Sequence, residues 1–226
     1  MTNRKGEKVL RVCIGYDPRE AVAFHVLSHS IMTHASGPVS IIPINKRNIP
    51  QFTRGMEDGS TEFSFSRFLT PWLCGYQGQA IFMDCDMLVR CDLYELLQFV
   101  GEYDVACVKH DYEPNPGTKF LGNVQHAYPR KNWSSLMVFN CWADGCKRLT
   151  PEVVNKASGA YLHRMQWADT IAPIPPTYNH LVGELEPNPD AKIIHYTLGT
   201  PCFDGYALQE HGGLWFTELK NATHHD

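Results

Sequence analysis

The sequence lacks three features that would place it in large functional classes. It has no run of lysine or arginine residues and a formal net charge of −4, so it has no basic stripe of the kind that binds nucleic acid. No stretch approaches the roughly 18–20 continuous apolar residues of a membrane span. The opening segment "MTNRKGEKVLRVCIGYD" has no long apolar run before its first expected strand. We therefore expect no signal peptide and a cytoplasmic location.

The composition is that of a folded domain. The chain has 226 residues, of which 43% are hydrophobic and 19% charged, which suits one domain with a substantial core. Its eight cysteines lie mostly inside apolar segments, as free buried thiols do in a reducing compartment. Cys141 and Cys146, in "CWADGC", lack the spacing of a zinc knuckle, and no second pair follows them.

Strand and helix patterns alternate along the chain. A strand over 8–15 leads into a helix, for which Asp17 can cap the first turn and Pro18 fits the first position. A strand over 39–44 follows. Further strands are expected at 80–89, 103–110, 133–140 and 192–201, and helices at 61–73, 91–99, 141–149 and 151–158. The opening strand–helix–strand order predicts an α/β fold with a mixed, mainly parallel sheet flanked by helices.

Two aspartates stand in one of the most apolar stretches of the chain, "IFMDCDMLV" over 81–89. Burying ionised carboxylates costs several kcal/mol, as an order of magnitude, unless something compensates their charge. If the strand continues through them, Asp84 and Asp86 share one face, and a divalent cation relieves their repulsion. Oxygen ligands of this kind favour Mg²⁺ or Mn²⁺. The alternative is that one aspartate caps a turn and the other faces solvent.

Several motifs in order resemble one enzyme family. "FSRFLTPWL", "QAIFMDCDMLV" and "DLYEL" look like the core of GT-A glycosyltransferases, most of all the retaining family eight, which includes glycogenin and bacterial lipopolysaccharide galactosyltransferases. "NWSSLMVFNC" and "IIHYTLGTPCF" resemble two later segments of that family, so the likeness runs over residues 9–203. It implies a Rossmann-like GT-A sheet in a single domain. Residues 8–110 would form the donor half, 111–203 the acceptor half with a late metal-binding segment, and 204–226 a tail.

The resemblance also implies roles for individual residues. Asp84, Asp86 and His195 would hold Mn²⁺ or Mg²⁺, and Arg67 would contact the donor. The other donor-binding positions it implies are Tyr16, Asp17, Ser134, Ser135 and Gly199. Each has a structural alternative: His195 bonded to backbone at a strand end, Arg67 as a helix-surface cation, Asp17 as a helix cap, and the two serines as strand packing.

The sequence departs from the family pattern at two places. The family's late segment carries a lysine that contacts the diphosphate, but here no lysine follows His195 until Lys220. The family's Asp-Gln pair on the acceptor side is also missing as a dipeptide, and Gln166 and Asp169 are the catalytic candidates in its place. Trp167 and Tyr178 nearby are either a sugar-stacking platform or core packing. The Pro/Gly-rich loop 111–131, with His110, Asp111 and His126 in or beside it, is either a lid or a surface loop.

The sequence therefore predicts a metal-dependent glycosyltransferase. It would move a hexose from a nucleoside-diphosphate sugar to a hydroxyl acceptor (a glycan, lipid or protein), with retention implied by the resemblance alone. A second hypothesis is a catalytically silent nucleotide- or carbohydrate-binding protein on the same fold. A third, a nucleotidyltransferase that makes such sugars, is disfavoured because "IGYDPRE" lacks the Gly-rich basic loop that this chemistry uses.

Overall fold

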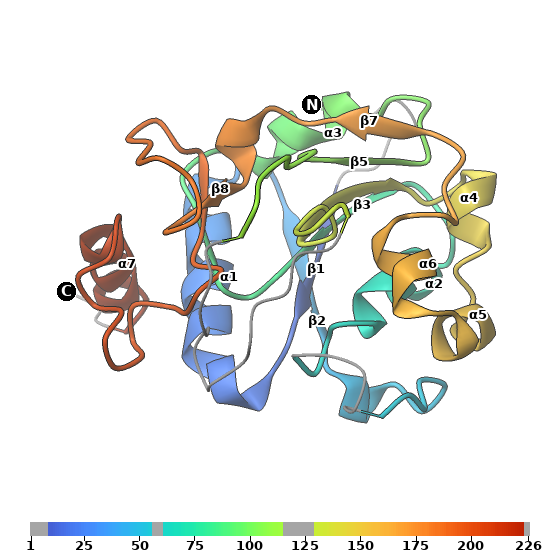
Figure 1. Ribbon diagram of the computed structural model, residues 1–226, viewed down its shortest axis with the longest axis horizontal. Helices are drawn as coiled ribbons and strands as arrows, with labels where there is room; N and C mark the ends of the chain where they lie inside the picture. Colours follow the sequence, from blue (N-terminus) through green and yellow to red (C-terminus); the bar gives the residue numbers. More distant parts are fainter. Residues whose placement is uncertain (1–8, 56–60, 115–128, 224–226) are drawn as a thin grey trace.

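A computed structural model describes residues 9–55, 61–114 and 129–223 of the chain. Two sheets form its centre (Figure 1). The larger has the strand order β2-β1-β3-β6-β5-β7 and the smaller the order β4-β9-β8. The strands of the larger sheet are β1 Leu10–Gly15, β2 Val39–Ile44, β3 Gln79–Met83, β5 Val105–Cys107, β6 Leu136–Asn140 and β7 Ile171–Pro173. Those of the smaller are β4 Met87–Val89, β8 His180–Leu181 and β9 Ile193–His195.

The larger sheet is mainly parallel, as the sequence predicts. β1 pairs in parallel with β2 and β3, and β5 pairs in parallel with β7. Only β6 runs against its neighbours β3 and β5. In the smaller sheet β4 is antiparallel to β9, and β9 is parallel to β8.

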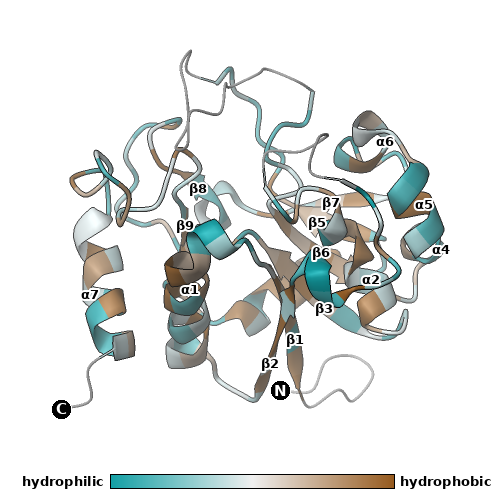
Figure 2. Ribbon diagram, turned by 90° about the horizontal axis from the view of Figure 1, so that it is seen from below, coloured by the Kyte–Doolittle hydropathy of each residue, from teal (hydrophilic) through white to brown (hydrophobic). Residues whose placement is uncertain are grey.

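Helices cover the larger sheet from both sides (Figures 1 and 2). One side carries α1, with α7 packed on the outside of α1, and the other carries α2, α4, α5 and α6. The α-helices are α1 Ala21–His34, α2 Thr70–Leu73, α3 Leu97–Val100, α4 Asp144–Lys147, α5 Pro151–Lys156, α6 Gly159–His163 and α7 Gly212–Thr223. Short 3-10 turns are Pro18–Glu20, Lys46–Asn48, Ser66–Leu69, Leu93–Leu96 and Pro176–Tyr178.

The core lies where the expected apolar faces meet. The strands β1 and β2 are coloured hydrophobic along their length in Figure 2. Five residues at helical spacing on one face of α1 are buried, namely Ala23, Val26, Leu27, Ser30 and Ile31. Removing a large apolar side chain from water contributes about 1.5–3 kcal/mol, so this face fixes α1 on the sheet. All eight cysteines are free and all but Cys202 are buried, which confirms the prediction of free, mostly buried thiols.

Two expectations from the sequence are wrong. Residues 80–89 do not form one strand, because β3 ends at Met83 and β4 begins at Met87 in the other sheet. Residues 204–226 are not an unpacked tail over their described part. Residues 212–223 form α7, whose Trp215 is fully buried although most of the segment is polar.

Within the described residues, no helix combines the length and apolar character needed to cross a bilayer.

Candidate functional site

The two aspartates of "DCD" lie in the turn that carries the chain from the larger sheet to the smaller. The Asp84 N–H donates to the Ser135 carbonyl at 2.9 Å, which ties the start of the turn to the segment before β6. The carbonyl of Asp86 accepts from the Tyr196 N–H at 2.9 Å, next to β9. These two hydrogen bonds fix both ends of the turn. Both carboxylates are mostly buried within it.

His195 completes a compact group of metal-ligand types with these aspartates. It is the last residue of β9 and pairs across the small sheet with Met87, directly after the turn. One ligand atom from each of Asp84, Asp86 and His195 lies within 4.8 Å of the other two. His195 Nε2 stands 3.3 Å from Asp86 Oδ1. The structure thus brings His195 next to two aspartates that lie more than a hundred positions earlier in the sequence.

Asn179 orients the imidazole of His195. Its Nδ2 donates to Ser135 Oγ at 2.9 Å, so its Oδ1 is the acceptor that faces His195 Nδ1 at 3.0 Å. His195 therefore carries a proton on Nδ1 and turns Nε2 toward Asp86. Sequence reasoning missed Asn179, because no spacing in "PPTYNHL" separates such a residue from ordinary loop asparagine.

Arg67 is the cation beside Asp84. Its Nη1 lies 2.8 Å from Asp84 Oδ1 and donates to the Ser134 carbonyl at 2.9 Å. Its Nε donates to the Ser64 carbonyl at 3.1 Å. Arg67 is buried, so its anionic partner is a structural necessity and the surface-cation alternative is wrong. Burial raises the pKa of Asp84 to about 6, with Arg67 lowering it and Asp86 raising it.

A third carboxyl group, that of Glu20, approaches the aspartates from the start of α1. Its side chain is buried, and its Oε1 has no hydrogen-bond partner in the described part of the chain. Burial raises the pKa of Glu20 to about 9, and repulsion from Asp86, Asp17 and Asp84 adds to the effect. In the sequence, Glu20 stands three residues after the helix cap Asp17, which suggests a role at the start of the helix. Its position near the aspartates could not be predicted from that spacing.

Tyr16 and Asp17 follow β1 and differ in their surroundings. Tyr16 is half-buried and packs edge-on against Phe24, with ring centroids 5.4 Å apart. Asp17 is fully buried and caps the following turn, since its Oδ1 accepts from the Arg19 N–H at 3.0 Å. Its Oδ2 accepts from the Glu62 N–H at 3.1 Å. Burial raises the pKa of Asp17, but these hydrogen bonds outweigh it and the net pKa is lowered.

Ser134, Ser135 and Gly199 all form hydrogen bonds within the protein. Ser134 Oγ lies 2.9 Å from His163 Nδ1, and Ser135 Oγ donates to the Asn132 carbonyl at 2.7 Å. Ser135 is thereby part of the chain of bonds that reaches His195. The Gly199 N–H donates to the Tyr196 carbonyl at 2.8 Å, so this amide is already engaged.

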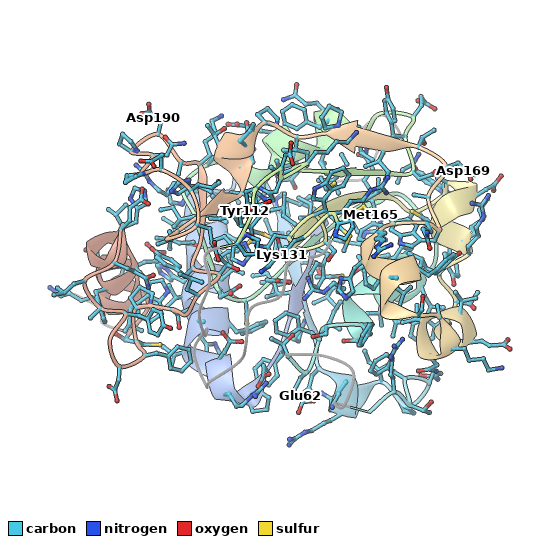
Figure 3. All side chains as sticks on the ribbon, in the orientation of Figure 1. Glu62, Tyr112, Lys131, Met165, Asp169 and Asp190 are labelled. Carbon is cyan, nitrogen blue, oxygen red and sulfur yellow. The ribbon has the colours of Figure 1, made fainter. Side chains whose placement is uncertain are left out.

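The described contacts do not join Gln166 and Asp169 to the metal-ligand group. Gln166 is exposed. Asp169 has a side chain that is 64% exposed and is bound by Arg148, with Nη2 to Oδ2 at 2.7 Å. Figure 3 shows Asp169 at the outer edge of the molecule, beside α4.

Trp167 and Tyr178 belong to the core, and the sugar-platform alternative is wrong for both. Trp167 is fully buried and stacks on Phe139, with ring centroids 5.9 Å apart. Tyr178 packs edge-on against Phe99 at 5.6 Å, and its hydroxyl donates to Glu95 Oε2 at 2.7 Å.

The loop after β5 is described only in part. His110 is mostly buried, its Nε2 has no hydrogen-bond partner among described residues, and burial lowers its pKa to about 3. His195 and His180 lower the pKa of His110 further. Asp111 is exposed, and His126 lies outside the described residues.

The residues Asp84, Asp86 and His195 fit a divalent cation. His195 Nε2 and Asp86 Oδ1 face each other at 3.3 Å, and with the proton on Nδ1 both atoms can offer a lone pair to one cation. Two carboxylates and one imidazole are ligands that suit Mn²⁺, and oxygen-rich sites also take Mg²⁺. Burial raises the pKa values of the Asp84 and Glu20 carboxyl groups, and a bound cation would lower them again.

The architecture is that of GT-A-type glycosyltransferases. The bifunctional glycosyltransferase WbbM superimposes with a TM-score of 0.63 at 17% identity, over 97% of this chain and 51% of its own. The glycosyltransferase GlyE of Streptococcus pneumoniae gives 0.63 at 15% identity, over 93% of this chain and 60% of its own. The galactosyltransferase LgtC gives 0.58 at 9% identity, over 96% of this chain and 98% of its own. The chain thus spans about half of WbbM, and these likenesses show the fold.

The chain belongs to the same family as Protein CDI of Arabidopsis thaliana. The two are 45% identical over 227 residues, which cover 95% of this chain and 87% of the plant protein. No model of a known protein family matches the sequence. The name of the plant protein describes no reaction.

Proposed function

We propose that this protein is a metal-dependent glycosyltransferase that moves a hexose from a nucleoside-diphosphate sugar to a hydroxyl acceptor, with retention. The observation that carries the proposal is the group Asp84, Asp86 and His195, gathered within 4.8 Å on a GT-A-type fold. The proposed metal is Mn²⁺ or Mg²⁺. When bound, it would neutralise the charge that develops on the departing nucleoside diphosphate.

Two neighbouring residues, Arg67 and Asn179, orient the side chains of this group. Arg67 fixes Asp84 and favours its ionised form, since its guanidinium lies 2.8 Å away. Asn179 fixes the tautomer of His195, so that Nε2 faces the ion. We propose that Arg67 also contacts the donor, because its Nη1 bridges Asp84 and the backbone of Ser134.

Lys131 is our candidate for the cation that the late segment lacks. It is buried and sits between Arg130 and Asn132, both of which have left-handed backbone, with φ of 62° and 60°. Asn132 Nδ2 reaches Thr197 Oγ1 at 3.5 Å, so this turn adjoins the segment that follows His195. Figure 3 shows Lys131 near the middle of the molecule. We propose that the Lys131 ammonium contacts the diphosphate, because the turn that carries it adjoins this segment.

The remaining roles are assigned by resemblance. Tyr16 is half-buried at the end of β1 and offers a ring face for the nucleobase. Asp17, Ser134, Ser135 and Gly199 would shape the donor pocket mainly through backbone and packing, since their side chains or amides already have partners. The catalytic role of Gln166 and Asp169 on the acceptor side remains a prediction. Their exposed positions do not add support to it.

A catalytically silent binding protein is the second candidate. The observation that favours it is the absence of any lysine between His195 and Lys220, together with the engagement of Asp169 by Arg148. Such a protein would bind a nucleoside-diphosphate sugar with Mn²⁺ but would release no nucleoside diphosphate with any acceptor.

One experiment separates these possibilities. A panel of nucleoside-diphosphate sugars is screened by thermal shift with and without Mn²⁺, and donors that bind are then assayed for nucleoside-diphosphate release with a range of acceptors. We expect one donor to raise the melting temperature only with Mn²⁺ and to be turned over. Asp86→Ala should abolish both effects, whereas Asp144→Ala, at an exposed surface pair, should change neither.

Lys131→Gln should weaken donor binding about tenfold or more, and Lys131→Arg should restore part of it. Turnover without metal would contradict the proposal. Binding without turnover would favour the silent protein.

A further inference from the structure

A second group of metal-ligand types lies outside the site described above. His180, in β8, and the neighbours Glu210 and His211, just before α7, have ligand atoms within 4.8 Å of one another. His180 Nε2 lies 3.0 Å from Glu210 Oε2, and His211 Nε2 lies 3.0 Å from Glu210 Oε1. All three side chains are largely buried, with 3%, 20% and 12% of their surface exposed respectively.

This group lies on the opposite face of the small sheet from His195. In the parallel pair β8–β9, His180 is in register with Ile194, and Leu181 with His195. Successive residues of a strand point to opposite faces, so His180 faces away from His195. Ile194 packs in the apolar cluster that contains Tyr196 and Trp215, which places this face toward α7.

The ligand atoms converge more closely than a surface network requires. Two imidazole nitrogens meet the two oxygens of one carboxylate. His211 Nε2 also donates to the Asn188 carbonyl at 3.0 Å, and a bound metal would replace this proton. The Asn188 N–H donates to Glu210 Oε1 at 2.7 Å and orients the carboxylate from outside. Ligand atoms around a tetrahedral zinc ion, with bonds of about 2.0–2.1 Å, stand about 3.3 Å apart. The two nitrogen–oxygen distances of 3.0 Å are slightly shorter than that value, and all three ligand atoms lie within 4.8 Å, so small side-chain shifts would admit the ion.

The backbone at His211 is held in an unfavourable conformation that aims its ring at this point. Its φ is 58°, in the left-handed region that costs a residue with a Cβ roughly 1–2 kcal/mol. The Tyr196 hydroxyl donates to the His211 carbonyl at 3.0 Å and holds that turn in place. Residues kept in such conformations are concentrated at ligand sites.

We propose that His180, Glu210 and His211 form a second metal site, which takes zinc or a similar transition-metal ion. Two imidazoles with one carboxylate suit zinc better than magnesium or calcium, whereas the two aspartates of the first site favour harder ions. The metal would cross-link β8 to the segment that leads into α7. It would also fix Asn179, the neighbour of His180, and with it the orientation of His195.

The test is a zinc titration of the full chain after removal of metal with EDTA, in excess Mg²⁺ and with a chromophoric chelator as competitor. We expect one zinc ion per chain in the wild-type protein and in Asp86→Ala. His211→Gln should weaken zinc binding at least about 100-fold, more than the loss of an outer-shell partner does. His29→Gln is the matched control, because His29 pairs with Glu218 at 2.6 Å and, within the described residues, no third metal ligand joins them.

A double variant and a cobalt spectrum make the outcome decisive. A double variant, His224→Gln with His225→Gln, should retain the ion, because it removes only the histidine pair near the end of the sequence. Cobalt added to the wild-type protein should give the visible absorption of a four-coordinate site, and this readout needs no variant to fold. Zinc that is lost in Asp86→Ala and kept in His211→Gln would overturn the proposal. So would the absence of zinc uptake and of the cobalt spectrum, which would leave a hydrogen-bond network only.

Discussion

At the scale of single residues, the site gathers several carboxyl groups in a buried setting. Asp84 has Arg67 at 2.8 Å, whereas Glu20 is buried and its Oε1 lacks a hydrogen-bond partner within the described chain. Charge that is arranged in this way costs stability in the empty protein and becomes favourable when a cation binds.

Glu20→Gln should stabilise the metal-free protein at neutral pH. Glu20 has a pKa of 4.5 in the unfolded chain and about 9 when folded, so folding at pH 7 requires proton uptake. Its contribution to stability is fully present below about pH 4.5 and is lost as the pH rises toward 9. Replacement by the neutral amide should raise the free energy of unfolding at pH 7 by roughly 3 kcal/mol, which corresponds to about 1.4 kcal/mol for each pH unit between 4.5 and 7.

Urea denaturation at several pH values measures this effect. The gain should grow with pH and vanish near pH 4. The exposed residue Glu113 provides a control, since Glu113→Gln should change little at any pH. A destabilised Glu20→Gln protein at pH 7 would show that the ionised carboxylate is stabilising.

Asn179→Ala should weaken Mn²⁺ binding while leaving the fold intact. The variant removes the acceptor that holds the Nδ1 proton of His195, and the loss of such outer-shell partners costs roughly 10–100-fold in metal affinity. Electron paramagnetic resonance of free Mn²⁺ gives the dissociation constant. Asn155→Ala, at a surface asparagine bonded to the Thr53 N–H, should leave it unchanged. An equal constant for Asn179→Ala and wild type would exclude the positioning role.

At the scale of elements, the small sheet β4-β9-β8 supplies much of the site and α7 supports it from behind. Ser30 of α1 accepts from the Val89 N–H at 3.1 Å, which fixes β4 on the helix. On α7, Trp215 is buried against the same cluster as Val26 and Ile194. This arrangement could not be predicted from the sequence, because strands of two or three residues and a mostly polar final helix give weak periodic signals.

Trp215→Ala should cost about 3–5 kcal/mol in the free energy of unfolding, the range for large core truncations. Phe216→Ala is the neighbouring control, since Phe216 is 39% exposed and should cost much less. Chemical denaturation compares the two variants. A small effect of Trp215→Ala would mean that α7 contributes little to the fold.

At the scale of the whole molecule, the sequence predicted most of the strands along the chain and three residues, Asp84, Asp86 and His195, that the structure brings together, but not how these parts meet. The apolar runs at 10–15 and 39–44 became β1 and β2, because period and composition are local properties. The break after Met83 was missed, since its cause is a change of sheet that only distant β9 defines. Asn179 and Glu20 act through tertiary contacts for the same reason.

Metal affinity of the whole protein should depend on pH with a known sign. Burial raises the pKa of Asp84 to about 6, so protons compete with the metal below that value. The Mn²⁺ dissociation constant should be nearly constant above pH 7 and rise by up to about tenfold per unit below pH 6. Calorimetric titrations between pH 5 and 8 test this. A constant affinity over that range would show that Asp84 is not a ligand.

The central claim is that Asp84, Asp86 and His195 hold a divalent ion that binds the diphosphate of the donor. The most direct measurement is calorimetry of nucleoside diphosphates, UDP, GDP, ADP and CDP in turn, with and without Mn²⁺, on the wild-type protein and on Asp86→Ala. We predict that one diphosphate binds the wild-type protein only when Mn²⁺ is present, and that Asp86→Ala binds none. Binding of equal strength without Mn²⁺, or binding that Asp86→Ala retains, would contradict the account.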